Sequence, residues 1–410
     1  MSFRGWILVL LVVLWVPACG MSQVGRDSAV RASITVVREV PLIGSATSSA
    51  ISESQFSPDQ PTTGELARVP GTQTVTPRAT EMVVPPRTAI PTRTAVPTGT
   101  AIPTATPIPT ATPSPTSTPE PTATLDPYAA LSVPALRAEQ YGREGEIEMV
   151  EVLESTDRFT RYLISFPSDG LRVGGFMNVP IGEGPFPVVI VNHGYMPPRR
   201  YETLTYTTKY ADVLAVAGFL VIHPNFRNHR GSDEGPNPFR IGYARDLLHL
   251  IPMAQRLPAA NGGPVGVWGH SMGGGIAIRA LTVTEQIGAA VLYGSMSGDE
   301  AQNYEAIMRW SGGAAARNGG LPEPPSNETL YQAISPSNYL EYIQAPVAIH
   351  HGVLDDQVPY VWAIELAERL AGAGIPYEFY SYDEQNHNFT GAGYDLLNER
   401  VIAFFREHLG

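Results

Sequence analysis

A serine between glycines offers the clearest chemistry in the chain. Ser271 stands at the centre of a G-x-S-x-G motif, residues 269–273. The apolar run 264–268 precedes the motif, and the helix-forming run 276–281 follows it. This order predicts a strand, a sharp turn and a helix, which exposes the hydroxyl at the end of a sheet and aims a helix N-terminus at a developing oxyanion. The alternative is a structural serine in a glycine-rich turn, so the partner residues must decide.

Two neighbouring aspartates are candidates for the acid of a catalytic triad. A serine hydroxyl becomes a strong nucleophile when a histidine takes its proton, and a carboxylate holds that histidine in one tautomer. For a nucleophile on a strand–turn–helix, the acid and then the histidine follow the serine along the chain. Asp355 and Asp356 come after the apolar run 347–350, where a loop is expected. Their spacing alone does not choose between them.

The general base is found by elimination among nine histidines. Only His387 and His408 follow the two aspartates. His408 lies in a terminal helical run, whereas His387 lies in a loop after a strand that ends at Tyr382. The sequence therefore predicts His387 as the base. His350 and His351 stand at a strand end without the spacing of further ligands, which argues against a metal site.

A developing oxyanion needs two hydrogen-bond donors. The backbone N–H of Met272, directly after the nucleophile, is the first predicted donor. The second should lie in the loop after an earlier strand, and residues 192–195 follow the apolar run 187–191 in that place. Tyr195 offers its backbone N–H as the candidate and its hydroxyl as a weaker one. The alternative is a strand-end turn that carries an aromatic lid residue.

Strands and helices are expected to alternate through most of residues 128–410. Short apolar runs predict strands, and runs with apolar residues at helical spacing predict helices. Three strands come first, at 147–153, 159–166 and 171–179. Further strands are expected at 187–191, 219–222, 265–268, 289–293, 347–350 and 377–380, with helices at 206–217, 241–257, 361–370 and 395–409. This order predicts an α/β fold whose mostly parallel sheet has helices on both faces and binds ligands at the carboxyl ends of its strands.

The first 19 residues predict export from the cytoplasm. One positive charge at Arg4 and an apolar stretch from Trp6 to Val16 are typical of a signal peptide, and the stretch is short for a membrane span. Cys19, the single cysteine, follows at once in a segment that resembles the lipobox of bacterial lipoproteins, where the cysteine is lipidated and anchors the chain. An ordinary cleaved signal with an incidental cysteine is the alternative. Either interpretation places the mature chain outside the cytoplasm, and a single cysteine excludes an intrachain disulfide.

A linker without a core is expected over residues 20–127. Serine, threonine and proline dominate it, Phe56 is its only aromatic residue, and prolines stand at every sixth position from 91 to 121. Six residues are two turns of polyproline II, so we expect a disordered, extended stalk in front of a catalytic domain at 128–410. The formal net charge of −12 argues against a nucleic-acid partner.

Residues 145–410 resemble the catalytic domain of the prolyl oligopeptidase family. The similarity rests on short motifs, namely Ser168-Asp169-Gly170, His193-Gly194-Tyr195, Asn225-Phe226-Arg227, Arg230-Gly231-Ser232, Gly269-His270-Ser271-Met272-Gly273-Gly274 and Ser335-Pro336-Ser337-Asn338-Tyr339. The most specific is His351-Gly352-x-x-Asp355-x-x-Val358-Pro359. In the family pattern the aspartate after His-Gly-x-x is catalytic, so the resemblance implies Asp355 as the acid and His387 as the histidine. It implies an α/β-hydrolase fold as well.

Two features depart from the family pattern. Family peptidases usually carry an N-terminal β-propeller that gates the site, and here the proline-rich stalk stands in its place. Asn388 replaces the family's glycine after the catalytic histidine. Dienelactone-hydrolase-like and acyl-esterase relatives share the same core without a propeller. We therefore expect an exported serine hydrolase of small-molecule or short-peptide substrates, a peptidase or a carboxylesterase, with a catalytically inactive binding domain less favoured. No cofactor is expected.

An insert at residues 297–335 interrupts the alternation of strands and helices. It lies between the strand after the nucleophile and the strand that carries the acid. Tyr304 and Trp310 come first in it, and paired glycines and prolines follow. Inserts at this place commonly cover a site. We therefore expect a small cap in which these two aromatic rings bind substrate.

Overall fold

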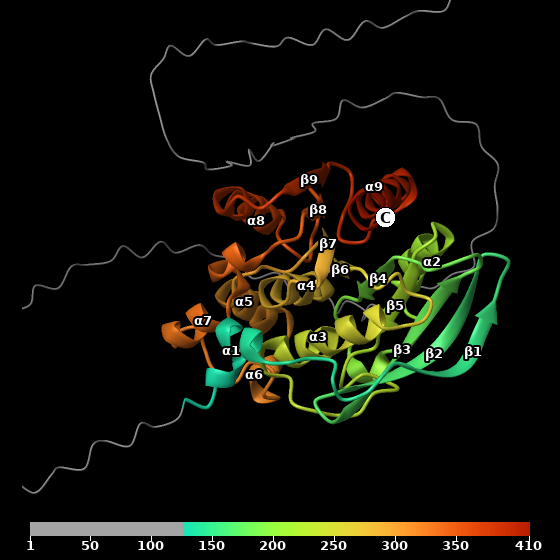
Figure 1. The fold of residues 1–410 in the computed structure, drawn as a ribbon. Coiled ribbons are helices and arrows are strands. Elements are labelled where there is room, and N and C mark those ends of the chain that lie inside the picture. The colour runs from blue at the N-terminus through green and yellow to red at the C-terminus, as the bar shows by residue number, and fades with distance from the viewer. Residues whose placement is uncertain (1–125) are drawn as a thin grey trace, which may run out of the picture. The chain divides into compact units, whose positions relative to one another are not determined.

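Nine strands form one mixed sheet within residues 126–410, the part of the chain that the computed structural model describes (Figure 1). Their order across the sheet is β1-β2-β3-β5-β4-β6-β7-β8-β9. The antiparallel part consists of β1 (Glu148–Ser155), β2 (Phe159–Ser168), β3 (Leu171–Pro180) and the β3–β5 pair. The parallel part consists of β5 (Leu220–Pro224), β4 (Val188–Asn192), β6 (Val265–His270), β7 (Ile287–Tyr293), β8 (Val347–Gly352) and β9 (Tyr377–Tyr382).

The predicted signal segment and Cys19 lie outside the described residues, as do residues 20–125 of the predicted linker. The division of the chain into these parts stays a prediction.

The central strands are built from apolar, mostly β-branched residues that bury both of their faces. In β4, Val188 and Ile190 belong to one hydrophobic core, and Val189 and Val191 belong to the other. Because successive side chains of a strand point to opposite faces of the sheet, one strand serves two cores. β4 also pairs on both sides, with β5 and with β6, so its backbone hydrogen bonds are made within the sheet.

Helices cover both faces of this sheet (Figure 1). One core takes in side chains of α1 (Val133–Ala138), α3 (Ile241–Gln255), α4 (Met272–Val283) and α8 (Tyr360–Ala373). The other takes in α2 (Thr208–Val216) and α9 (Gly391–Leu409). Short 3₁₀ helices lie in the connections: η1 (Ala129–Leu131), η2 (Pro198–Arg200), η3 (Pro238–Arg240), η4 (Pro336–Asn338) and η5 (Leu340–Tyr342). Within residues 126–410, no helix is both long enough and apolar enough to cross a bilayer.

Three helices occupy the insert between β7 and β8. They are α5 (Glu300–Trp310), α6 (Ala314–Arg317) and α7 (Glu328–Ile334). The Asp299 side chain caps α5 by accepting a hydrogen bond from the N–H of Ala301 at 2.8 Å. Glu300 is buried and pairs with Arg279 of α4 at 2.5 Å and with Arg240. A buried carboxylate between two guanidinium groups therefore ties the insert to the helices on the sheet.

The predicted fold class is confirmed. Every strand and helix expected from the apolar pattern is present, and the ends differ by a few residues. The helix expected from residue 206 begins at Thr208, for example, and leaves Tyr206 in the preceding loop. Apolar periodicity reports which residues are buried, whereas capping and turn geometry set where an element begins.

Candidate active site

Ser271 occupies a strained turn between β6 and α4. Its backbone has φ 55° and ψ −117°, outside the common regions for a residue with a side chain. A Cβ added at Gly269 would lie 2.3 Å from the carbonyl oxygen of Gly273, and one at Gly273 would lie 2.2 Å from that of Asn192. Neither contact is possible, so both flanking positions of the motif require glycine. The turn leaves Ser271 half-buried at the carboxyl end of a central strand.

His387 and Asp355 are joined by a hydrogen bond. The His387 Nδ1–H donates to Oδ2 of Asp355 at 2.8 Å. The other carboxylate oxygen, Oδ1, accepts from the N–H groups of Gln357 and Val358 at 2.9 and 2.8 Å. Asp356 points its side chain to solvent. The structure therefore brings His387 together with Asp355 and not with Asp356.

His351 supplies a further donor to the same carboxylate. Its Nε2 lies 3.1 Å from Oδ2 of Asp355 and 3.1 Å from the carbonyl oxygen of Val358, so the two acceptors share one N–H, and the Asp355 side chain is fully buried. Burial alone would raise the pKa of Asp355, but the hydrogen bonds from His351 and His387 hold that pKa well below its usual range. Asp355 is thus a charged acceptor that fixes the imidazole of His387 in the Nδ1–H tautomer.

His270 links the turn that carries Ser271 to the loop that carries His387. The His270 Nε2–H donates to the carbonyl oxygen of His387 at 3.0 Å, and the two rings lie 4.5 Å apart. Since His270 precedes Ser271 directly, the loop that carries His387 is attached to the turn that carries the serine. Within residues 126–410 no hydrogen bond occupies Nε2 of His387, the nitrogen that a general base would use.

The loop after β4 passes directly beside the serine. A Cβ added at Gly194 would lie 2.5 Å from the hydroxyl oxygen of Tyr206 and 3.1 Å from Cβ of Ser271, so a larger residue here would displace one or both side chains. The N–H of the next residue, Tyr195, has no acceptor among the described residues, and its side chain is 67% exposed. Met272 is the first residue of α4, and an N–H at that position has no intrahelical acceptor. Both predicted oxyanion donors are therefore backbone groups near Ser271.

Tyr304 and Trp310, the predicted substrate-binding residues, lie on α5. Tyr304 packs edge-to-face on Tyr331 of α7 with ring centroids 6.1 Å apart. Trp310 is 50% exposed at the last position of the helix. Across the described residues, neither ring makes a recorded contact with Ser271, Asp355 or His387.

Three residues near the site were not predicted from the sequence. The hydroxyl of Tyr206 bonds both His270 and the loop after β4, and His351 bonds Asp355. Gly294 follows β7, and a Cβ added there would lie 3.2 Å from Nδ1 of His387 and 3.3 Å from Oδ2 of Asp355. The only sequence signal among them is the position of His351 inside the His-Gly-x-x-Asp motif.

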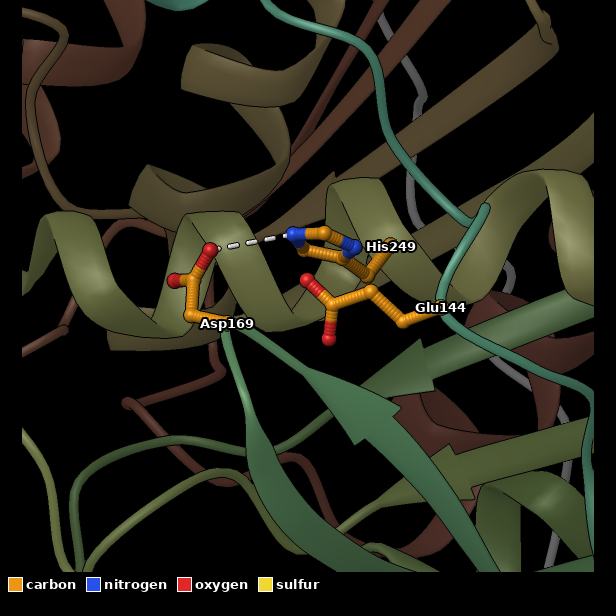
Figure 2. A group of neighbouring side chains, drawn as sticks. All are labelled: Glu144, Asp169 and His249. Carbon is orange, nitrogen blue, oxygen red and sulfur yellow. Dashed lines mark hydrogen bonds and ion pairs between the residues drawn. The ribbon is translucent and has the colours of Figure 1, made fainter.

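One cluster of potential metal ligands occurs among residues 126–410, formed by Glu144, Asp169 and His249 (Figure 2). Nδ1 of His249 accepts a hydrogen bond from the N–H of Gly142 at 3.2 Å, so its Nε2 carries the proton and donates to Asp169 at 3.1 Å. Neither nitrogen has a lone pair left for an ion. Asp169 also accepts two hydrogen bonds from Arg245, both at 2.7 Å. These residues do not fit a metal.

The same aspartate belongs to a structural ion-pair network. Arg227 bonds Asp169 at 2.8 Å and the fully buried Asp246 of α3 at 2.7 Å. Ser168 donates to Asp246 at 2.7 Å. Two of the short motifs, residues 168–170 and 225–227, therefore meet here, where they join the β2–β3 turn to α3 and to the loop after β5.

A family comparison agrees with this geometry. The model of the prolyl oligopeptidase family matches residues 205–410, a range that contains Ser271, Asp355 and His387. The chain belongs to the prolyl oligopeptidase family. It is a serine hydrolase with the α/β-hydrolase fold.

Two curated relatives span about the length of the hydrolase part. The Bacillus subtilis (strain 168) peptidase YtmA, itself uncharacterized, is 27% identical over 238 residues, or 56% of this chain and 86% of YtmA. A Synechocystis sp. protein provisionally named carboxymethylenebutenolidase is 23% identical over 242 residues, or 55% of this chain and 85% of the relative.

Two solved structures share the fold. Acetyl xylan esterase 1 from Thermoanaerobacterium sp. JW/SL YS485 has a TM-score of 0.52 at 18% identity, over 67% of this chain and 92% of the esterase. The Pyrococcus horikoshii acylaminoacyl peptidase also has a TM-score of 0.52, at 20% identity, over 62% of this chain and 42% of the peptidase. At these identities the likeness shows the fold alone.

Gly294→Ala is expected to lower kcat by about tenfold or more with little change in KM, because the added methyl group presses on the His387–Asp355 pair. Gly294 also has φ +49°, which a residue with a side chain adopts only with strain. Gly298→Ala is the matched control, since its Cβ meets only an ordinary contact of 3.4 Å with Ser337. Steady-state kinetics on a short acyl ester would measure both, and equal losses would contradict the argument.

Asp169→Asn is expected to cost on the order of 3 kcal/mol of unfolding free energy at pH 7, because it leaves Arg227 and Arg245 without their shared partner. Burial alone would raise the pKa of Asp169, but hydrogen bonds from Arg245, His249 and Arg227 hold it well below the usual range. A carboxylate with a depressed pKa contributes its full stabilisation above its unfolded-state pKa of about 3.9. That contribution is lost as the pH falls toward the pKa of the folded state. The difference in unfolding free energy between wild type and Asp169→Asn should therefore become smaller below about pH 4.

Urea unfolding of Asp169→Asn and wild type at pH 7 and pH 3 would measure this difference. The exposed neighbour Glu144 supplies the control, because Glu144→Gln should change stability only slightly. A wild-type Tm that rises on adding Zn²⁺ or Ca²⁺, with no such rise in Asp169→Asn, would instead indicate a metal site.

Proposed function

We propose that Ser271, His387 and Asp355 form the catalytic triad of an exported hydrolase that cleaves acyl bonds in esters and short peptides. The observation that carries the proposal is the hydrogen bond of 2.8 Å from His387 to Asp355, beside a serine held in a strained turn. A serine with only a structural role would need neither that backbone strain nor a buried, ionised Asp355 bonded to His387.

The reaction begins with attack by Oγ of Ser271 on the acyl carbonyl carbon. His387 takes the hydroxyl proton on Nε2, and the Asp355 carboxylate stabilises the imidazolium that forms. The N–H groups of Met272 and Tyr195 donate to the oxyanion of the tetrahedral intermediate. When the carbonyl re-forms, the bond to the leaving group breaks and His387 returns its proton to that group. Water, deprotonated by His387, then attacks the acyl-enzyme and releases the acid and Ser271.

A carboxylesterase is the second candidate for the substrate class. The specific observation in its favour is that acetyl xylan esterase 1 is matched over 92% of its length, whereas the acylaminoacyl peptidase is matched over 42%. Esters also have a better leaving group than amides, so one triad acts on them more readily. A panel of short acyl esters and peptide amides tests this, and we expect fast ester hydrolysis with slower but measurable peptide cleavage.

The triad assignment makes a graded prediction. Ser271→Ala and His387→Ala should each lower kcat by at least about a thousandfold. Asp355→Ala should be severe, because His387 loses its orienting charge, whereas Asp356→Ala should be mild. Labelling with a fluorophosphonate probe gives an independent reading and should vanish in Ser271→Ala. A crippling effect of Asp356→Ala would refute the acid assignment, and an unlabelled wild type would favour a catalytically inactive binding domain.

Substrate choice is proposed to depend on the insert 297–335, with Trp310 and Tyr304 as contacts. Trp310 keeps half of its surface exposed, so its ring is free to meet a ligand. Trp310→Ala should change KM and the ranking of substrates far more than the rate of probe labelling, and Trp310→Phe should retain most of the ranking. The substrate panel and a Tm on the same proteins check this. A large fall in Tm with an unchanged ranking would show that the ring only supports the insert.

We also propose that a lipid attached to Cys19 anchors the chain to a membrane. The support is the position of the single cysteine directly after an apolar signal core. Cys19→Ser should release the protein from membranes or block its processing, and Ser22→Ala, three residues on, should leave both unchanged. Cell fractionation with mass analysis of the N-terminus checks this. Membrane retention of Cys19→Ser with normal processing would overturn the lipid anchor.

A further inference from the structure

The hydroxyl of Tyr206 lies between the nucleophile turn and the loop after β4. Tyr206 comes just before α2 and belongs to none of the recognised motifs. Its oxygen is 2.6 Å from Nδ1 of His270 and 2.9 Å from the backbone nitrogen of Gly194. A Cβ added at Gly194 would lie 2.5 Å from this hydroxyl and 3.1 Å from Cβ of Ser271, so all four groups meet in one small space.

The direction of each hydrogen bond in this cluster is determined. The carbonyl oxygen of His387 can only accept, so His270 must carry its proton on Nε2. Nδ1 of His270 is then an acceptor, and the Tyr206 O–H must donate to it. The same hydroxyl oxygen accepts from the N–H of Gly194. Burial lowers the pKa of His270 to about 3, with His387 acting in the same direction, so the ring stays neutral and the order persists at neutral pH.

These bonds link three loops that come from different strands. The Gly194–Tyr195 loop follows β4, His270 ends β6, and the His387 loop follows β9. The first of these loops carries a proposed oxyanion donor and the last carries the proposed base. The ring of His270 also packs in a tilted arrangement against two other rings, with centroids 4.5 Å from that of His387 and 4.4 Å from that of Tyr293. A displacement of one of these segments should therefore displace the other two.

We propose that Tyr206 and His270 are positioning residues that hold the Tyr195 N–H and His387 in register with Ser271. The inference rests on the proposed triad and extends it with two residues that need not touch substrate. The oxyanion exists only in the tetrahedral intermediate, so a displaced donor weakens transition-state binding more than substrate binding. Loss of the Tyr206 hydroxyl should therefore appear in kcat and leave KM nearly unchanged.

The first test removes the hydroxyl and keeps the ring. Tyr206→Phe should lower kcat on a short acyl ester by about ten- to a hundredfold, with KM within about threefold of wild type. Tyr141→Phe is the control, because it likewise removes a hydrogen-bonded hydroxyl, which donates to the carbonyl of Leu136 at 2.9 Å in a different part of the fold. A kcat in Tyr206→Phe equal to that of Tyr141→Phe, at similar Tm, would overturn the proposal.

The second test asks whether the two residues act as one unit. His270→Phe retains an aromatic ring beside Tyr293 and loses both hydrogen bonds. If the residues form one network, the double variant with Tyr206→Phe should lose no more kcat than the worse single variant. Losses that multiply in the double variant would mean that the residues act independently, and the network would be rejected.

A third measurement does not depend on turnover. The Nδ1–H proton of His387 is held against Asp355, and proton NMR observes such imidazole protons at low field. Tyr206→Phe should shift or broaden this resonance, and Tyr141→Phe should not. If wild type neither hydrolyses substrates nor reacts with a fluorophosphonate, the proposed function fails while this spectrum still tests the positioning. An unchanged resonance in Tyr206→Phe would overturn it.

Discussion

The strained backbone of Ser271 is the constraint on which the site depends. At φ 55° and ψ −117° the turn is costly, and it persists because β6 is paired on both sides in the middle of the sheet. Glycines at 269 and 273 let the β4 loop, β6 and α4 approach one another more closely than any side chain would permit. The two backbone N–H groups proposed as oxyanion donors belong to the segments that this approach brings next to the serine turn. The backbone strain at Ser271 and the arrangement of the groups around it thus have the same cause, the close packing of these segments.

Two carboxylates with reduced access to water serve different ends in this fold by the same physics. Asp355 is fully buried and Asp169 is partly buried, and in each the surrounding donors outweigh the effect of burial and keep the carboxyl ionised. Around Asp169 the donors are arginines from separate segments, so the charge joins the β2–β3 turn to α3. Around Asp355 they are backbone N–H groups and two histidines, and within residues 126–410 no hydrogen bond occupies Nε2 of His387. That nitrogen turns a structural ion pair into a proposed reactive centre.

The curated relatives include an uncharacterized peptidase and a protein provisionally named carboxymethylenebutenolidase, which fits a core that serves more than one substrate class. A sheet with a nucleophile turn, an acid and a histidine supplies acyl transfer without regard to the leaving group. The insert between β7 and β8 is attached to that core by the buried Glu300 and its two arginines. The proposed chemistry and the proposed substrate choice therefore lie in different parts of the chain, which this buried ion pair joins.

The sequence by itself determined the fold class and the strand–turn–helix around Ser271, because apolar periodicity and glycine spacing are local signals. The choice of His387 as the general base stays a prediction. It could not separate Asp355 from Asp356 by spacing, since the two are adjacent in one loop. Only the tertiary structure buries one carboxylate beneath the N–H groups of residues 357 and 358 and leaves the other in water. Tyr206 had no sequence signal either, because its partner His270 lies 64 residues away, and His270 meets the loop of His387 across another 117. Hydrogen bonds between segments so distant are decided by how the strands are ordered in the sheet, and no local pattern encodes that order.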